Sequence, residues 1–310
     1  MTARSAHAGR AAIDSMPSLS SIDAPAPSPT QEPRLPVIPR RRALRLSSIQ
    51  LIFLVFGLVM VLFLVLPLAT MVFSVSPAKL YATLLEDEVW RAILLTIMSG
   101  LWATFFGLLF GVPLAYLLAR HRFPGKRLIE GLVDLPVVIP HTAAGIALLS
   151  VFGRKFYGGK FFEFFGISFV GAEPGIVIAM MFGSVPFLIN AARDGFLAVD
   201  PRMEQVAQSL GASPVKTFWT ITLPLARRSI LTGAMLMWSR GISEFGAVFI
   251  LVYHPMVAPV LVWNRFETYG LDYAKPVAVL LLLLCVMVFI TLRTFGIGKA
   301  VPRSRAERIQ

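Results

Sequence analysis

Residues 203–224 read MEQVAQSLGASPVKTFWTITLP, a polar and helix-compatible segment between two strongly apolar blocks. Asp200 and Pro201 stand just before it, and these residue types suit a helix N-cap and the first helical position. A chain built of apolar blocks that also carries an ordered polar element usually presents that element to a soluble partner. The segment therefore predicts a docking element at the surface of a membrane.

Within this segment the pattern predicts a helix, a turn and the start of a second helix. Apolar residues recur at spacings of three and four and form one stripe, made of Met203, Val206 and Leu210. Gly211 permits the chain to turn, and Ser213 with Pro214 can begin a short helix that ends at Pro224. A helix lying in the lipid headgroup layer is the alternative. Such a helix does not need Gly and Leu-Pro at these spacings, which favours docking.

The composition is that of an integral membrane protein. Hydrophobic residues make up 56% and charged residues 15% of the chain, and the mean hydropathy is +0.73. A soluble domain is about half apolar and about a quarter charged. The net charge of +12 does not indicate nucleic acid binding, because the basic residues fall in the gaps between apolar blocks. The single cysteine, Cys285, excludes a disulfide framework within the chain.

Residues 1–45 differ in kind from the rest. They are rich in Ala, Ser, Pro and Arg, so we expect a disordered cytoplasmic tail. The tail ends in Arg40, Arg41 and Arg42, close to an apolar run over residues 49–73. A twin-arginine export signal is the alternative. A signal of that kind has only about 7–15 apolar residues, so the longer run favours a retained first span.

Several apolar blocks are long enough to cross a bilayer, which takes about 20 helical residues. We expect about six spans, at 48–75, 91–119, 132–152, 174–196, 227–252 and 274–297. Some contain Pro or Gly, which membrane helices tolerate where neighbouring helices satisfy the freed backbone groups. The sequence thus predicts an all-α integral membrane protein, with a membrane domain over 46–300 and a basic cytoplasmic tail over 301–310.

Basic residues are distributed unevenly between the two sides of this predicted domain. One side holds the arginine cluster of the tail together with Arg120, Arg122, Lys126, Arg127, Arg193, Arg202, Lys216, Arg227 and Arg228. The opposite loops mix fewer basic residues with carboxylates such as Glu86, Glu88 and Glu267. Because the basic side is the cytoplasm, we expect both termini and the segment 200–224 inside the cell.

The sequence contains little that could catalyse a reaction. No Gly-x-x-x-x-Gly-Lys-Ser/Thr phosphate loop occurs, so the chain cannot hydrolyse ATP by that route. The four histidines are scattered, and no cluster of His, Cys and carboxylates has metal-site spacing. We therefore name no catalytic residue, no metal ligand and no cofactor of this chain. A membrane-embedded enzyme is the alternative that these observations argue against.

Two charged residues, Arg240 and Glu244, lie four positions apart in the fifth expected span. At that spacing they share one helix face. The helical rise from Arg228 is about 18 Å, which places Arg240 near the middle of the membrane. Intramembrane charges cost about 2.5–3.5 kcal/mol each on insertion scales and mark cavities or pathways by default. A structural Arg–Glu pair that holds helices together is the other interpretation, and both can be true.

The segment 203–224 resembles the cytoplasmic EAA loop of ABC importer permeases, which docks on the ATP-hydrolysing subunit. The family pattern is Glu-Ala-Ala, then Gly, then Ile-x-Leu-Pro; the chain keeps Ala207, Gly211, Ile221, Leu223 and Pro224 at the right spacing. It departs from the pattern at Gln205 and Val206, although Glu204 lies alongside. The resemblance implies these contact residues for an ATPase: Glu204, Gln205, Ala207, Gly211, Ala212, Ser213, Pro214, Leu223 and Pro224.

Other stretches resemble the sulfate/molybdate/tungstate branch of these permeases. They are SRGISEFGAV (239–248), YHPMVAPVL (253–261), RFETYGL (265–271) and LPVVIPHT (135–142), and the likeness covers roughly 50–297. The second and third look closest to tungstate/molybdate members, and a sulfate or other anion permease is the alternative. The resemblance implies a type I permease fold in a prokaryotic inner membrane. It also implies candidate pathway or gate residues: Arg240, Ser243, Glu244, His141, Asn264 and Arg265.

The same resemblance implies the partners. Two copies of the chain would enclose one pathway as a homodimer, docked on two ATPase subunits that bind ATP and Mg²⁺. An extracytoplasmic binding protein would deliver a tungstate- or molybdate-type oxyanion, lipid would surround the spans, and nucleic acid is not expected as a partner.

Some alternatives stay open. His141 is either a pathway residue or a satisfied core histidine, and we favour the core. Asn264 and Arg265 lie in an expected outer loop, which is either a gate and docking surface or an ordinary solvated loop. A secondary transporter or channel is the main rival function. Such folds show repeated halves with discontinuous helices in matching positions, and no internal repeat is visible here.

Overall fold

The computed structural model describes residues 47–296, with side chains as far as Ile290. Every regular element within that range is a helix, which confirms the all-α fold class. The tails expected over 1–45 and 301–310 lie outside the described residues. The chain divides into two compact units, Met1–Met60 and Val61–Gln310.

The helix α1 (Ser48–Phe73) begins in the first unit and ends in the second. None of its residues is buried. A helix that is apolar on every side belongs in lipid or against an apolar partner, because it has no face that water can solvate. By its length and composition α1 is therefore a candidate membrane span.

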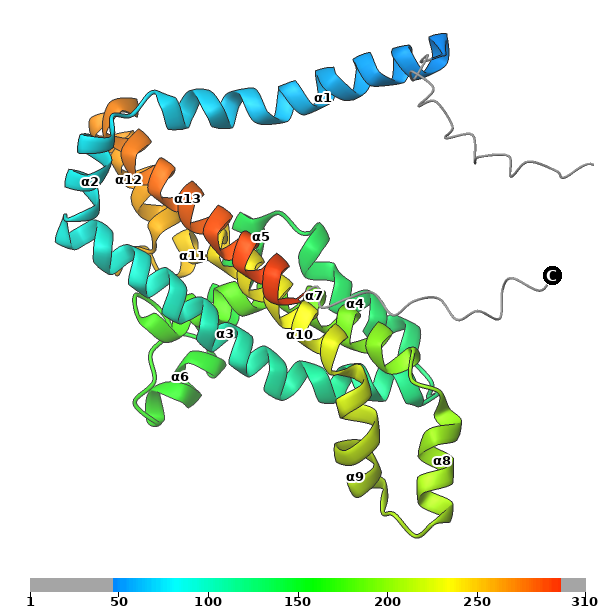
Figure 1. Ribbon diagram of the computed structural model, residues 1–310. Helices are drawn as coiled ribbons and strands as arrows, with labels where there is room; N and C mark the ends of the chain where they lie inside the picture. Colours follow the sequence, from blue (N-terminus) through cyan, green and yellow to red (C-terminus); the bar gives the residue numbers. More distant parts are fainter. Residues whose placement is uncertain (1–46, 297–310) are drawn as a thin grey trace, which may run out of the picture. The chain divides into compact units, whose positions relative to one another are not determined.

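The rest of the second unit contains all the other described helices. They are α2 (Pro77–Leu84), α3 (Asp87–Arg120), α4 (Lys126–Val138), α5 (His141–Phe152), α6 (Tyr157–Phe164), α7 (Glu173–Leu197), α8 (Pro201–Ser209), α9 (Pro214–Thr217), the π-helix η1 (Phe218–Thr222), α10 (Leu223–Ile242), α11 (Gly246–Leu251), α12 (Ala258–Tyr269) and α13 (Leu271–Gly296). The centre is formed by α3, α7 and α10, which pack along one another (Figure 1). A Cβ atom on Gly233 would lie 2.8 Å from the Ala191 Cβ, so glycine lets α10 approach α7 closely.

Among the described residues, four helices are long and apolar enough to cross a membrane: α1, α3, α7 and α13 as far as Ile290. A fifth span results if α4 and α5, which are bent by 117° at their junction, are counted together. We expected about six. The remaining expected span, 227–252, is divided into α10 and α11, and Arg227, Arg228 and Arg240 make α10 less apolar than the four spans.

Two expected spans are thus broken rather than continuous, and a feature of the nearby residues accompanies each break. Between α4 and α5, Ile139 is extended at φ −69° and ψ 135°, because the residue before a proline is disfavoured in the helical region. Between α10 and α11, the Glu244 carboxylate accepts the Ala247 N–H at 3.3 Å and so replaces a helical bond at the start of α11.

The two breaks meet in space, because α5 packs on α11. A Cβ atom on Gly246 would lie 2.7 Å from the Cβ of His141, so only glycine permits this approach. The packing carries the first residue of α5 to the non-helical residues that follow α10.

Candidate functional site

Residues 200–224 form a hairpin, hereafter the docking hairpin, in which α8 and α9 lie side by side beyond the ends of α7 and α10 (Figure 1). The Asp200 carboxylate accepts the N–H of Arg202 at 2.9 Å and caps α8, with Pro201 at its start. This confirms the predicted helix start. Gly211 at the turn has a φ of +89°, a conformation that costs glycine no steric strain.

The second helix of the hairpin begins where we predicted but ends elsewhere. The Ser213 hydroxyl accepts the N–H of Lys216 at 3.3 Å and caps α9. The prediction that this helix ends at Pro224 is wrong, because α9 continues through η1 into α10. Proline has no N–H and its ring collides with the carbonyl four residues earlier. The wider π turn, in which Leu223 donates to the Phe218 carbonyl, accommodates that proline.

The apolar stripe of the docking hairpin faces away from the chain. Met203, Val206 and Leu210 are all exposed, and Leu210 is the most exposed of them at 84%. Val215 and Trp219, on the second arm, are exposed as well. Exposed apolar side chains that lie together on an ordered element indicate a protein contact surface.

The predicted contact residues divide by exposure. Gln205, Gly211, Ser213, Pro214 and Pro224 are exposed, and Ala207, Ala212 and Leu223 are half-buried. Glu204 is different, since it is only 9% exposed. Its carboxylate turns inward to Arg120, the last residue of α3, at 2.8 Å. From the sequence we expected Arg120 only as one of the basic residues of the cytoplasmic side, because nothing in the local pattern links it to a residue 84 positions away.

An open groove of about 1220 Å³ lies between the docking hairpin and the end of α3. Its lining includes Arg120, His121, Arg122 and Lys126 from one side and Gln205 and Gln208 from the hairpin. Val215, Phe218 and Trp219 of the second arm line the same groove, so it combines a basic edge with an apolar wall.

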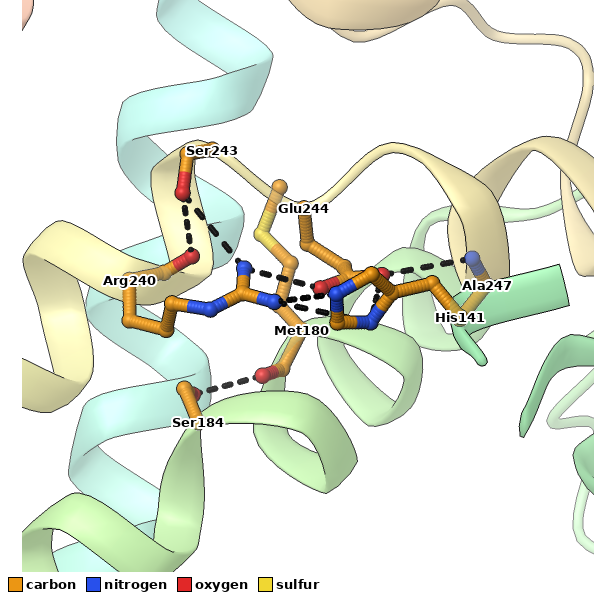
Figure 2. Close-up of polar contacts among 7 residues, drawn as sticks. All are labelled: His141, Met180, Ser184, Arg240, Ser243, Glu244 and Ala247. Carbon is orange, nitrogen blue, oxygen red and sulfur yellow. Dashed lines mark hydrogen bonds and ion pairs between the residues drawn. The ribbon is translucent and has the colours of Figure 1, made fainter. Parts of the chain in front are cut away.

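The second group of predicted residues forms a charge cluster of Arg240, Glu244 and His141 (Figure 2). Arg240 Nη1 lies 3.0 Å from Glu244 Oε2. Glu244 is 1% exposed, although it follows the end of α10 instead of lying on the expected helix face. His141 reaches the pair from α5: its Nε2 is 2.8 Å from Arg240 Nη2 and its Nδ1 is 3.5 Å from Glu244 Oε1.

The short contact between His141 and Arg240 restricts how the ring can be hydrogen-bonded. A guanidinium group only donates hydrogen bonds, so the Nε2 atom of His141 accepts from Arg240. In the neutral ring the remaining proton is on Nδ1, which faces the Glu244 carboxylate. His141 therefore bridges the cation and the anion. The interpretation of His141 as a core histidine is wrong, since its side chain is 46% exposed.

Ser243 and the backbone of α7 at Gly183 lie close to the charge cluster. The Ser243 hydroxyl donates to the Arg240 carbonyl at 2.9 Å and lies 3.4 Å from Arg240 Nη1. On the α7 side, a Cβ atom on Gly183 would lie 3.0 Å from Glu244 Oε2. The guanidinium group and the imidazole ring keep partial exposure while the carboxylate has almost none. A ligand that enters this region meets positive and neutral donors before it meets the buried negative charge.

Asn264 and Arg265 do not join the charge cluster. They lie on α12, so the expected outer loop at this position is helical. The Asn264 amide donates to the Tyr253 hydroxyl at 2.6 Å, and Arg265 pairs with Glu86 and Glu88 at the start of α3. Burial lowers the pKa of Arg265, but the hydrogen bonds that Arg265 donates to both carboxylates raise it by more, so the pKa lies above its ordinary value. The arginine thus ties α12 to α3.

Within the part of the chain that the structure describes, no group of three or more His, Cys, Asp or Glu residues could hold a metal ion. The candidate site thus consists of the two parts described above, the docking hairpin and the charge cluster.

Comparisons with known proteins agree on one family. Residues 107–305 match the family described as the binding-protein-dependent transport system inner membrane component. The molybdate/tungstate transport system permease protein WtpB of Methanocaldococcus jannaschii is 41% identical over 213 residues, which are 69% of this chain and 84% of that protein. The protein of the same name from Thermococcus kodakarensis is 45% identical over 214 residues, 69% of this chain and 81% of that protein.

A solved structure shows the same fold. A bacterial ABC transporter that imports the acidic polysaccharide alginate aligns over 81% of this chain and 96% of its own, with a TM-score of 0.65 and 16% identity. At that identity the likeness concerns the fold alone.

Proposed function

We propose that this chain, which belongs to the family of binding-protein-dependent transport system inner membrane components, forms the membrane pathway of an ATP-driven importer for tungstate- or molybdate-type oxyanions. It is a multi-pass membrane permease. The substrate class rests on the relatives that are 41% and 45% identical and are named molybdate/tungstate permeases. A sulfate or other anion permease is the alternative within the same family.

The observation that carries this proposal is the exposed docking hairpin. The chain has no phosphate loop, so energy must come from a partner. An ordered element with an exposed apolar stripe and a capped, glycine-turned hairpin supplies a surface for such a partner. We assign that partner as an ATPase subunit that binds ATP and Mg²⁺ and receives the stripe of Met203, Val206 and Leu210 in a groove.

We propose the remaining partners from the family to which the chain belongs. Two copies would enclose one pathway, with one ATPase on each docking hairpin. An extracytoplasmic binding protein would deliver the oxyanion on the opposite side. Both termini and the hairpin would then lie in the cytoplasm, as the distribution of basic residues predicts.

Within this pathway Arg240 would meet the passing oxyanion. Its guanidinium group is partly exposed while its counter-ion Glu244 is buried. A positive group in a region of low dielectric constant offsets the desolvation of an anion. The nearby carboxylate weakens the attraction, which suits a pathway that must release what it admits.

A secondary transporter remains the second candidate, because one observation favours it. The junctions α4–α5 and α10–α11 are broken helices that meet in space, and secondary transporters place binding sites at such breaks. Ion-driven transport would leave the docking hairpin without a purpose, so we prefer the ATP-driven importer.

The decisive experiment is reconstitution of the chain in liposomes with the ATPase subunit and the binding protein of its source organism. We expect uptake of molybdate and tungstate that requires internal ATP and the binding protein, with weaker competition by sulfate. Uptake that persists without the ATPase and follows a proton or sodium gradient would instead establish secondary transport.

A further inference from the structure

The Glu204 carboxylate joins three parts of the chain at one oxygen atom. Its Oε1 accepts from Arg120 Nε at 2.9 Å and lies 2.8 Å from Arg120 Nη2. The Thr222 hydroxyl donates to the same oxygen at 2.9 Å. Arg120 ends α3, Glu204 is on α8, and Thr222 closes η1 just before α10. One buried carboxylate thus links α8 to the end of α3 and to the second arm of the docking hairpin, just before α10.

Burial makes this junction stiff. The side chains of Arg120 and Glu204 are only 9% and 11% exposed, and Thr222 is fully buried. Hydrogen bonds with a charged donor or acceptor are roughly twice as strong as neutral ones, and low dielectric surroundings strengthen them further. Arg120 also donates from Nη2 to the Val199 carbonyl at 2.9 Å, which fixes the chain just before α8.

Aromatic packing surrounds the junction on the same elements. The Tyr116 ring from α3 lies 5.0 Å from the Phe218 ring of η1 and 5.4 Å from the Phe196 ring of α7, both edge-to-face. A rigid body that includes the ends of α3 and α7 and the start of α10 therefore meets α8 through the ion pair. The exposed contact residues of α8 touch the partner, whereas Glu204 touches the rest of the chain.

We infer that Arg120, Glu204 and Thr222 are positioning residues that transmit the displacement of α8, the first arm of the docking hairpin, to α3 and, through the second arm, to α10. The inference rests on the proposed function, since it needs an ATPase that moves the hairpin. A partner that pulls on α8 must move whatever α8 is joined to, and this junction is the charged, buried connection. Without it the displacement of α8 reaches α3 less completely, and more ATP is hydrolysed for each oxyanion transported.

The test is the ratio of oxyanion transported to ATP hydrolysed, measured in proteoliposomes with the ATPase and the binding protein. We expect the double variant R120Q/E204Q to bind the ATPase like the parent and to hydrolyse ATP. Its transport-to-ATP ratio should fall by about 5-fold or more, the range of a typical coupling between two sites. A merely structural role would lower membrane abundance and leave this ratio unchanged.

Thr222 supplies a milder variant in case the double variant does not fold. T222V keeps the shape of the side chain and removes the hydroxyl, whereas T222S keeps the hydroxyl and serves as its matched control. We expect T222V to lower the ratio and T222S to leave it near the parent value. A second control is the ion pair of Arg193 on α7 and Glu130 on α4, whose Nη1 and Oε1 atoms are 3.4 Å apart. Its neutral variant R193Q/E130Q should keep the parent ratio.

The outcomes separate the inference from the proposed function. If both R120Q/E204Q and T222V transport as much oxyanion per ATP as the parent, the inference is wrong, while the proposed ATP-driven permease still holds. If R120Q/E204Q does not accumulate in the membrane, the ratio of T222V alone decides. A parent protein that neither binds the ATPase nor transports would refute the proposed function itself.

Discussion

Replacing Arg240 with methionine leaves the Glu244 carboxylate buried without its main counter-charge. Glu244 is 1% exposed and lies 3.0 Å from the guanidinium group that this change removes. Breaking a buried pair by removing one partner costs about 3–5 kcal/mol. His141 stays 3.5 Å from the other carboxylate oxygen in this variant and remains a polar neighbour of it, so we expect the lower end of that range.

The second charge can be removed together with the first. In the double variant R240M/E244Q no unpaired charge stays buried, and the amide oxygen can still accept the Ala247 N–H that starts α11. Replacing a whole buried pair with neutral groups is often close to neutral for stability. The structure therefore predicts that the double variant is more stable than R240M, although it carries more changes.

The assay has two readouts, thermal unfolding of the purified protein in detergent and oxyanion uptake at matched membrane abundance. We expect R240M to unfold on the order of 10 °C below the parent, from about 3 kcal/mol in a domain of this size, and R240M/E244Q to recover most of that loss. If Arg240 meets the oxyanion, the double variant recovers stability but not uptake. Parent stability in R240M would refute the buried-pair reasoning, and full uptake in the double variant would leave Arg240 as a structural partner only.

Three further changes test other parts of the molecule. Gly211→Val forces a β-branched residue into φ +89°, so the affinity for the ATPase should fall. Gly211→Asn is the control, because asparagine tolerates that conformation and should keep the affinity of the parent. Equal affinity of both variants would show that the turn is not part of the docking surface. Gly183→Ala places a Cβ atom 3.0 Å from the carboxylate of the charge cluster and should lower stability by about 1–3 kcal/mol. Gly131→Ala, which meets nothing within 4 Å, is its control, and the same loss in both would exclude a specific contact. The last change tests the orientation in the membrane, with single cysteines introduced after Cys285 has been replaced. An impermeant maleimide added to intact cells should label a cysteine at the exposed Thr268 but not one at the exposed Gln208. The reverse labelling would show that the docking hairpin lies outside the cell.

Local features of this protein were predictable because the residue types that cause them are adjacent in the chain. Asp200 and Pro201 start α8, and Gly211 adopts a positive φ, both as the sequence indicated. The membrane class followed from composition, since long apolar blocks have few other stable environments. These properties depend on backbone preferences and on periodicity within about one or two helical turns.

The break at Ile139 and Pro140 could not be predicted from the neighbouring residues alone. A proline in a span can bend a helix slightly or end it, and neighbouring helices decide which. Here the end of α4 is stable because α5 turns by 117° and packs on α11. Pro140 permits the break locally, and the packing of α5 decides that the expected span 132–152 is bent there.

Only the tertiary structure brought the functional groups together. His141 reaches Arg240 across 99 positions, and Arg120 reaches Glu204 across 84. Whether Glu204 points to a partner or into the chain depends on which face of α8 lies against the end of α3. Helix faces are chosen by the packing of all neighbours at once, and no window of sequence contains that information. The sequence by itself determined the membrane class, the docking hairpin and the residue types of the site, whereas packing decided which charges meet.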